Sequence, residues 1–253
     1  QLSYDEEENW TYEIGTKTRW LDDSLQANAS VFYYDYQDRQ VGITVEDPEV
    51  PGFPASGIAN AAKATTQGIE VDVVWSPMEY LDLGVGYAYT DAEWDDFNYS
   101  SIRENGPTIK DQSICGNAQG DCSGADISGI PKNALTVLGS WQQPLGDYGM
   151  DWFLNANAQY QSKRSLSEQV NVAYVDSFWT ADAQLGLQTD TWSVMLFATN
   201  LFDDDTVQWA QFYQDFKDGM YGGAFGGEPR DEAIFAFLPE PRVVGIRGTW
   251  KTK

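Results

Sequence analysis

Aromatic side chains are concentrated in a long polar segment near the end of the chain, between about residues 203 and 238. Rings that lie among Gly and Asp can stack against a flat or sugar-like ligand. The same rings can instead pack the segment against its neighbours, and the sequence alone leaves both interpretations open. The candidate ligand-binding residues are Trp209, Phe212, Tyr213, Phe216, Tyr221 and Phe225.

Three consecutive carboxylates, Asp203, Asp204 and Asp205, open this segment. Carboxylate oxygens are ligands for hard divalent cations. Adjacent acids in a loop are, however, usually only solvated. We therefore predict neither a metal site nor a cofactor.

The chain contains no His. This excludes nucleophile activation by a Ser-His-Asp triad, His-ligated zinc and general-base chemistry by His. A pair of carboxylates of the glycosidase type stays open in principle, because the chain has 39 acidic residues, but no spacing singles one out. We predict that the protein is not an enzyme.

The only two cysteines, Cys115 and Cys122, lie in a segment rich in Gly, Ser and Asp. Two thiols cannot form a zinc site with four ligands, so a disulfide that closes a small loop is the better interpretation. A disulfide indicates an oxidising location outside the cytoplasm.

The charge of the chain is −24, with 15 basic residues against 39 acidic ones. Such a chain is not expected to bind nucleic acid by neutralising phosphates. No apolar run approaches the length of a membrane helix, whereas the strands of a membrane barrel are shorter and half polar. The first residue is Gln1, and we expect a processed or truncated start.

The segment from Trp10 to Trp20 alternates strictly between apolar and polar residues, which is the period of a strand with one apolar face. Its apolar side begins and ends with Trp. At about 3.3 Å per residue and a tilt near 40°, the segment rises roughly 25 Å, which is the height of the lipid band between the aromatic girdles of a membrane barrel. We therefore predict a strand that spans a bilayer.

The same alternation recurs along the chain. Short turns and long connections follow one another, so that every long connection falls at one end, as in outer-membrane barrels. The long connections are expected near 47–63, 91–131, 163–177 and 203–238. About nine strands result, and we predict an all-β, antiparallel, up-and-down transmembrane β-barrel. The further strands are Leu25 to about Val45, Gln67 to Trp75, Leu81 to Glu93, Ala134 to Gln142, Met150 to Tyr160, Trp179 to Leu187, Trp192 to Ala198 and Pro241 to Trp250.

Two segments carry a family resemblance. Asn200-Leu201-Phe202-Asp203 ends the penultimate strand, and Pro241-Arg242-Val243-Val244 opens the last one. With Tyr12-Glu13-Ile14-Gly15, Phe32-Tyr33-Tyr34-Asp35-Tyr36 and Gly68-Ile69-Glu70-Val71 in the same order, the chain resembles the C-terminal part of a TonB-dependent outer-membrane receptor.

This resemblance implies that residues 1–253 are C-terminal strands of a 22-stranded barrel whose plug is absent from this segment. It implies a place in the outer membrane of a Gram-negative bacterium, in contact with lipid, and with the TonB complex through the missing plug. It also implies uptake of a scarce, bulky solute such as a ferric siderophore.

Two alternatives stay open at this point. An autonomous small porin-like barrel would need an even number of strands, because an open edge in lipid leaves backbone groups unpaired. A soluble carbohydrate-binding β-domain would instead cover the apolar faces with protein.

Overall fold

Nine antiparallel strands form one continuous sheet in the computed structural model, which describes residues 4–46, 54–97, 121–166, 174–214 and 232–251. Each strand of the sheet pairs with the strand that comes next along the chain, except that two small hairpins lie between consecutive strands and are not part of the sheet. The predicted all-β, up-and-down arrangement is therefore confirmed. In sheet order the strands are β1 (Glu8–Trp20), β2 (Leu25–Glu46), β3 (Pro54–Met78), β4 (Leu81–Phe97), β5 (Asn133–Pro144), β6 (Asp151–Gln161), β9 (Phe178–Gln188), β10 (Trp192–Thr199) and β13 (Val243–Trp250).

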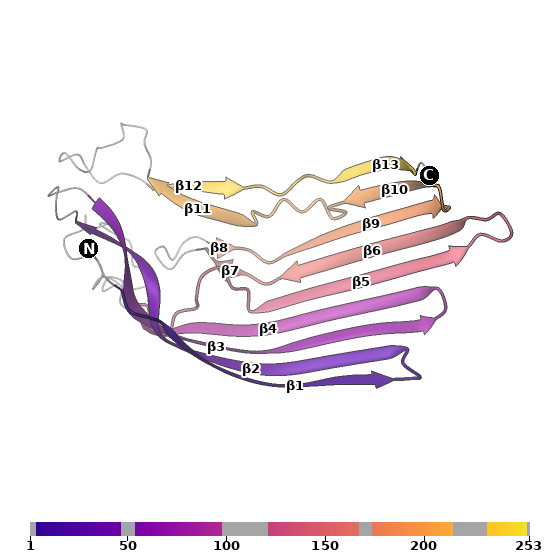
Figure 1. The fold of residues 1–253 in the computed structure, drawn as a ribbon. Coiled ribbons are helices and arrows are strands. Elements are labelled where there is room, and N and C mark those ends of the chain that lie inside the picture. The colour runs from indigo at the N-terminus through magenta and orange to yellow at the C-terminus, as the bar shows by residue number, and fades with distance from the viewer. Residues whose placement is uncertain (1–3, 47–53, 98–120, 167–173, 215–231, 252–253) are drawn as a thin grey trace.

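Two short hairpins interrupt this order. One pairs β7 (Arg164–Ser165) with β8 (Tyr174–Val175), and the other pairs β11 (Trp209–Gln214) with β12 (Glu232–Phe237). Both lie in connections between long strands and at the same end of the sheet (Figure 1). In the part of the chain that the structure describes, no helix is long and apolar enough to cross a membrane.

The connections divide the sheet into two different ends. Short turns at 21–24, 79–80, 145–150 and 189–191 lie together at the right of Figure 1, and we call this the turn end. The two hairpins lie at the opposite end, which we call the loop end. Leu21, Asp22 and Asp23 have positive φ angles, so the turn between β1 and β2 reverses the chain with three residues in the left-handed region.

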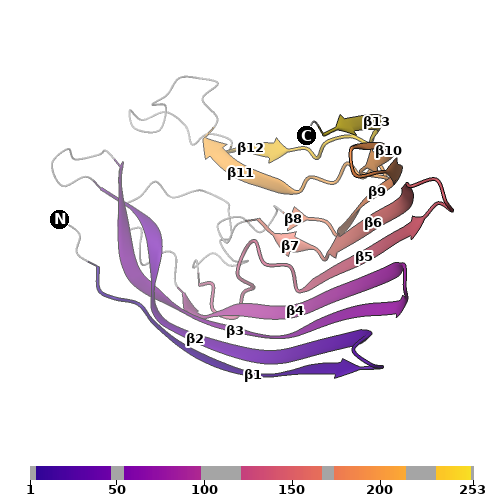
Figure 2. The same ribbon diagram turned by 45° about the vertical axis from the view of Figure 1, so that its right-hand side comes forward.

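One face of the sheet is apolar across all its strands, because the two-residue period and the antiparallel register bring outward residues into rows. Ile14 pairs with Val31, and Val31 pairs with Ile69. Their exposed fractions are 74%, 46% and 46%, and no second layer covers this face among the described residues. Figure 2 shows the strands as one curved wall. The soluble alternative, which required such a layer, is not supported.

The inner face is polar and closely fitted where aromatic rings lie over cross-strand glycines. Phe32 pairs with Gly68, and Phe153 pairs with Gly186. A Cβ atom at Gly68 would lie 2.5 Å from the Phe32 ring, and one at Gly186 would lie 2.6 Å from the Phe153 ring. Only glycine leaves room for these rings, which occupy the space that a side chain would take and so fix the register of the strands.

The structure corrects the extent of the predicted loops. The region near 47–63 is strand from Pro54 onward, because β2 and β3 stay paired as far as Glu46 and Pro54. Strand β4 runs to Phe97 inside the region 91–131. The regions 163–177 and 203–238 contain the two hairpins. Backbone groups that reach beyond the membrane still need partners, and continued pairing supplies them.

Candidate ligand-binding site

The hairpin of β11 and β12 carries the first of the predicted ligand-binding residues. The rings of Trp209 and Phe237 lie 4.8 Å apart at the base of the hairpin, and about half of each side chain is exposed. Arg164 donates a hydrogen bond of 2.7 Å to the carbonyl of Gln208 and a second one to Gln161 Oε1. Burial lowers the pKa of this guanidinium. These bonds connect the base of the hairpin to β6 and β7.

The other predicted residues are placed only in part. Phe212 pairs with Ile234 and Tyr213 with Ala233 along the backbone of the hairpin. Phe216, Tyr221 and Phe225 lie outside the described residues. The role of all six aromatic residues in ligand binding therefore stays a prediction.

A second aromatic group, which the sequence analysis did not select, lies on the inner face at the loop end. The guanidinium carbon of Arg39 lies 4.8 Å from the centre of the Trp94 ring and 5.8 Å from that of Tyr36. Among the described residues, no carboxylate forms an ion pair with Arg39. The site therefore offers an uncompensated cation between aromatic rings, which suits an anionic ligand with flat groups.

The segment from Asp121 to Ile130 supports this group by extending the sheet beside β4. Trp94 N donates to the carbonyl of Ala125 at 3.0 Å, and Ile127 N donates to the carbonyl of Ala92 at 2.9 Å. Trp94 is 4% exposed and packs on Phe97 at 4.6 Å between ring centres. The surrounding buried cluster consists of Ala62, Ala64, Ala92, Trp94, Phe97, Cys122 and Ile127. The chain thus buries one side of Trp94 and fixes the ring under Arg39.

A cluster of acidic residues lies beside this segment. Oxygens of Asp91, Glu93 and Asp126 lie within 4.8 Å of one another, a spacing that also suits a metal ion. Lys132 Nζ lies 2.9 Å from Asp91 Oδ1 and 3.0 Å from Asp126 Oδ1. Hydrogen bonds from the ammonium group to these two carboxylates raise the pKa of Lys132. The lysine therefore supplies the positive charge that the carboxylates need.

The three carboxylates of 203–205 lie at the base of the connection between β10 and β11, and two of them have structural partners. Arg242 N donates to Asp203 Oδ1 at 3.0 Å, and Thr206 N donates to Asp204 Oδ1 at 2.8 Å. Burial raises the pKa of Asp204, but hydrogen bonds from Thr206 and from the backbone of Trp179 outweigh it, so the pKa is lowered overall. The bond from Arg242 joins the two sides of the connection, and the bond from Thr206 is local to its first side.

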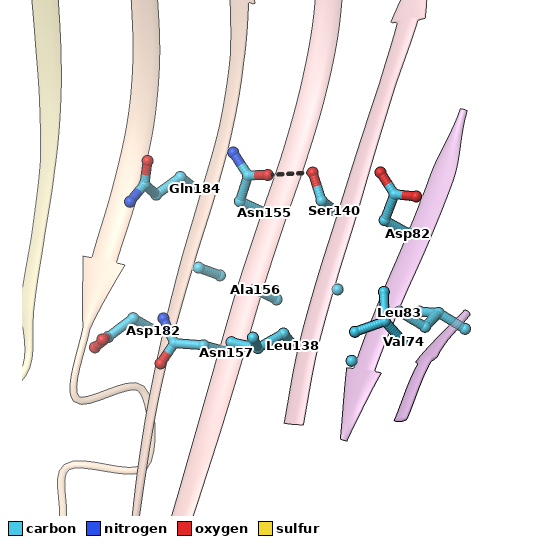
Figure 3. Close-up of a pocket in the computed structure, with 13 residues that line it drawn as sticks. Val74, Asp82, Leu83, Leu138, Ser140, Asn155, Ala156, Asn157, Asp182 and Gln184 are labelled. Atoms are coloured by element: carbon cyan, nitrogen blue, oxygen red, sulfur yellow. Dashed lines mark hydrogen bonds between the residues drawn. The ribbon is translucent and has the colours of Figure 1, made fainter. Parts of the chain in front are cut away.

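A depression of about 360 Å³ lies on the inner face nearer the turn end, and both polar and apolar residues line it (Figure 3). Asp82, Ser140, Asn155 and Gln184 form one row across four strands, as their pairing requires. Ser140 Oγ donates to Asn155 Oδ1 at 2.8 Å. Asp182 and Asn157 lie on the next row. This wall can hydrogen-bond a polar group inside the barrel, and it holds no arrangement suited to covalent chemistry.

Cys122 is fully buried in the cluster around Trp94, and no cysteine of the described residues is free. Cys115 lies outside the described residues. The disulfide between Cys115 and Cys122 therefore stays a prediction.

An antiparallel sheet with an apolar outer face, a polar inner face and all its extended connections at one end defines the wall of a transmembrane β-barrel. Residues 3–201 match the model of one particular family, the TonB dependent receptor-like β-barrel. The chain belongs to this family of receptors, and it is a protein of the Gram-negative outer membrane.

Relatives and solved structures agree with this assignment. The chain is 24% identical over 225 residues to the ferric-pyoverdine receptor PbuA of a Pseudomonas species, covering 87% of this chain and 23% of the relative. It is 31% identical over 138 residues to PiuA of Acinetobacter baumannii, a probable TonB-dependent siderophore receptor, covering 53% of this chain and 15% of PiuA. The crystal structure of the ferric yersiniabactin uptake receptor FyuA from Yersinia pestis has the same fold, with a TM-score of 0.64, 16% identity and coverage of 96% of this chain and 29% of that one. The chain thus spans between 15% and 29% of the length of these proteins.

Proposed function

We propose that this chain forms the C-terminal part of the barrel of a receptor that imports a ferric siderophore. The observation that carries the proposal is the match of residues 3–201 to the receptor family, together with relatives that are named as siderophore receptors. In this proposal residues 1–253 are the last strands of a barrel of 22 strands, and the plug belongs to another part of the protein. The protein acts by binding and transport and not as an enzyme.

The chemistry at the loop end supports a siderophore as the ligand. Ferric chelates carry anionic oxygens, and many present flat aromatic groups. Arg39 offers a cation held between Tyr36 and Trp94, and Trp209 offers a half-exposed ring at the base of the hairpin of β11 and β12, which also lies at the loop end. Cation–π and stacking contacts of this kind recognise such groups without requiring one particular chelate.

Release into the periplasm requires energy in this proposal. The family name implies that TonB supplies it, and we place the contact with TonB outside this chain, in the plug. The depression that contains Asp82, Asn155 and Gln184 lies further along the inner face, where these three side chains offer hydrogen bonds to the plug or to a passing solute.

The test compares two arginines in the intact receptor. Arg39 and Arg247 both stack on an aromatic ring, Arg247 lying 5.1 Å from the centre of the Phe197 ring nearer the turn end. Arg39→Gln should weaken binding of the ferric complex about ten-fold or more, because one charge-assisted contact is lost. Arg247→Gln is the matched control and should leave binding unchanged.

Binding and transport are measured separately with radioactive iron, in cells in which this receptor is the sole route for the chelate. Ferric complexes of pyoverdine, of yersiniabactin and of a catecholate serve as probes, at low temperature for binding and at growth temperature for uptake. A protonophore should abolish uptake and spare binding. Failure of all three chelates to bind, or uptake that continues with the protonophore, contradicts the proposal.

A further inference from the structure

An apolar groove of about 380 Å³ lies near the turn end of the sheet, where β4, β5 and β6 run side by side. Every residue of its lining is apolar in character. The lining consists of Leu81, Leu83, Gly139, Trp141, Trp152, Leu154 and Ala156. In β4 and β6 these are the outward residues, so the groove belongs to the face that meets the membrane.

The groove exists because two small residues meet in one row. Leu83 pairs with Gly139, and Gly139 pairs with Ala156. A Cβ atom added at Gly139 would meet only Leu83 Cδ2, at 3.8 Å, so the space above this glycine is open. The next row toward the turn end holds Leu81, Trp141 and Leu154, whose larger side chains form its border.

Two tryptophans mark the level at which the groove begins. The rings of Trp141 and Trp152 stack at 5.9 Å with 25° between their planes. Trp side chains gather at the level of the lipid headgroups in membrane proteins. From Trp152 to Ala156 the groove extends over about 13 Å of strand, at about 3.3 Å per residue. This length fits within one leaflet, and the leaflet is the one at the turn end, which faces the periplasm.

Water does not suit this groove, because its lining offers no side-chain hydrogen-bond partner apart from the two indole N–H groups. A hydrocarbon chain suits it, since the groove is continuous with the lipid-facing surface. We propose that the groove seats one acyl chain of a glycerophospholipid of the periplasmic leaflet. The proposal depends on the place of the chain in the membrane and not on the solute that the receptor imports.

The charge of the adjacent turns favours one headgroup. The turns that border the groove carry Glu79 and Asp147, and the segments 76–82 and 145–151 contain no Lys or Arg. A headgroup with an ammonium group is attracted there, whereas a headgroup with only negative charge is repelled. Phosphatidylethanolamine should therefore occupy the groove in preference to phosphatidylglycerol.

The first experiment fills the groove in the intact receptor. Gly139→Leu places a side chain in the open space, and Gly248→Leu is the matched control. Gly248 lies on the same outer face in β13, and an added Cβ there meets nothing within 4 Å. Native mass spectrometry counts the phospholipids that stay bound during titration with each of the two lipids.

We expect the receptor to retain one phosphatidylethanolamine that Gly139→Leu binds roughly ten-fold more weakly, the change expected when about two methylene groups lose their apolar contact. Gly248→Leu should bind it as the unaltered receptor does. Equal binding by both variants overturns the proposal. So does a change of oligomeric state in Gly139→Leu without a change in lipid binding, which would assign the groove to a second copy of the receptor.

A second experiment needs no variant. Phosphatidylethanolamine with a photoactivatable diazirine in the middle of one acyl chain is incorporated with the receptor into vesicles and illuminated. Crosslinks should concentrate on the peptides that contain Gly139 and Ala156. Labelling that is uniform over the outward residues of all strands overturns the proposal, because it would show only the general lipid surroundings of the barrel.

Discussion

Replacing Asn200 tests how the base of the last long connection is held together. Asn200 directly follows β10 and has a φ of 49°, in the left-handed region that Asn tolerates better than most residues. Its Nδ2 donates to the carbonyl of Asp204 at 2.9 Å and to that of Glu240 at 3.0 Å. Its Oδ1 accepts from Asp204 N at 3.0 Å. One amide side chain therefore joins both sides of the connection.

The expected effect follows from these contacts. Asn200→Ala removes three hydrogen bonds, each worth about 0.5–1.5 kcal/mol, and the lower part of that range applies because the site is partly exposed. It also puts a residue with a Cβ and no polar group in the left-handed region, at about 1 kcal/mol. The two effects together should lower the local free energy of unfolding at the base of the connection by about 3 kcal/mol. Asn200→Gly should lose about 2 kcal/mol, because glycine adopts the left-handed region freely.

Hydrogen exchange of the intact receptor measures this local stability directly. A loss of about 3 kcal/mol should speed exchange at the amides of Asp204 and Arg242 by about 100-fold, and the glycine variant should change it less. Asn155→Ala is the matched control, since this Asn accepts one hydrogen bond from Ser140 on the neighbouring wall. It should leave both amides as they are.

Two results would refute the reasoning. If Asn200→Ala leaves exchange at Asp204 and Arg242 unchanged, the side chain does not hold the connection. If the glycine variant is the less stable of the two, the left-handed backbone is not the source of the difference between them. In the first case, the bond from Arg242 N to Asp203 would be sufficient to hold the base.

Three further predictions concern other parts of the wall. Gly186→Ala should destabilise the barrel by about 2 kcal/mol in chemical unfolding, because the added Cβ would lie 2.6 Å from a backbone oxygen. Gly86→Ala is its control: an added Cβ there has nothing within 4 Å, so the stability should change by less than about 0.5 kcal/mol. The hydrogen bonds that raise the pKa of Lys132 stabilise the folded protein. This contribution is fully present below the unfolded pKa of about 10.4 and is lost as pH rises through the folded pKa. Lys132→Gln should therefore abolish the corresponding alkaline change in thermal unfolding. Thiol labelling of the unfolded protein without reductant should modify neither Cys115 nor Cys122, and labelling of the unfolded protein after reduction should modify both.

The strands and their faces are the part of the fold that the sequence predicts well. Contact with lipid requires an apolar residue at every second position, and this requirement is local, so it is visible along a strand such as Trp10 to Trp20. Strand β1 accordingly begins two residues before that segment and ends at the same residue. The start of β3 was not predictable in this way, because Pro54 looks like a loop residue. At the first position of a strand its missing N–H does little harm, and pairing with the end of β2 decides the outcome.

The group around Arg39 depends on features that no local pattern contains. The register between β2 and β3 shifts between Tyr36 and Arg39, and Asp38 has a φ of 51°. This bulge brings Arg39 to the same face as Tyr36. Trp94 is held by the segment 122–127, which lies far along the chain and takes the place of β5 beside β4. An aromatic and charged segment at 34–39 was visible in the sequence, but its partner was not.

The length of the strands explains where a charged ligand can be bound. Leu25 begins β2 at the turn end, and Arg39 follows 14 residues later. At about 3.3 Å per residue and a tilt near 40°, Arg39 lies roughly 35 Å above that end, whereas the apolar band is about 25 Å high. The arginine therefore lies beyond the hydrocarbon, where its charge is hydrated before the ligand arrives. Asp82 is the second residue of β4 and lies at the turn end of the inner wall, where Ser76 Oγ donates a hydrogen bond to its carboxylate. The apolar outer band thus separates the external group around Arg39 from the inner wall, and under the proposed function the first would bind the anionic chelate and the second would guide it.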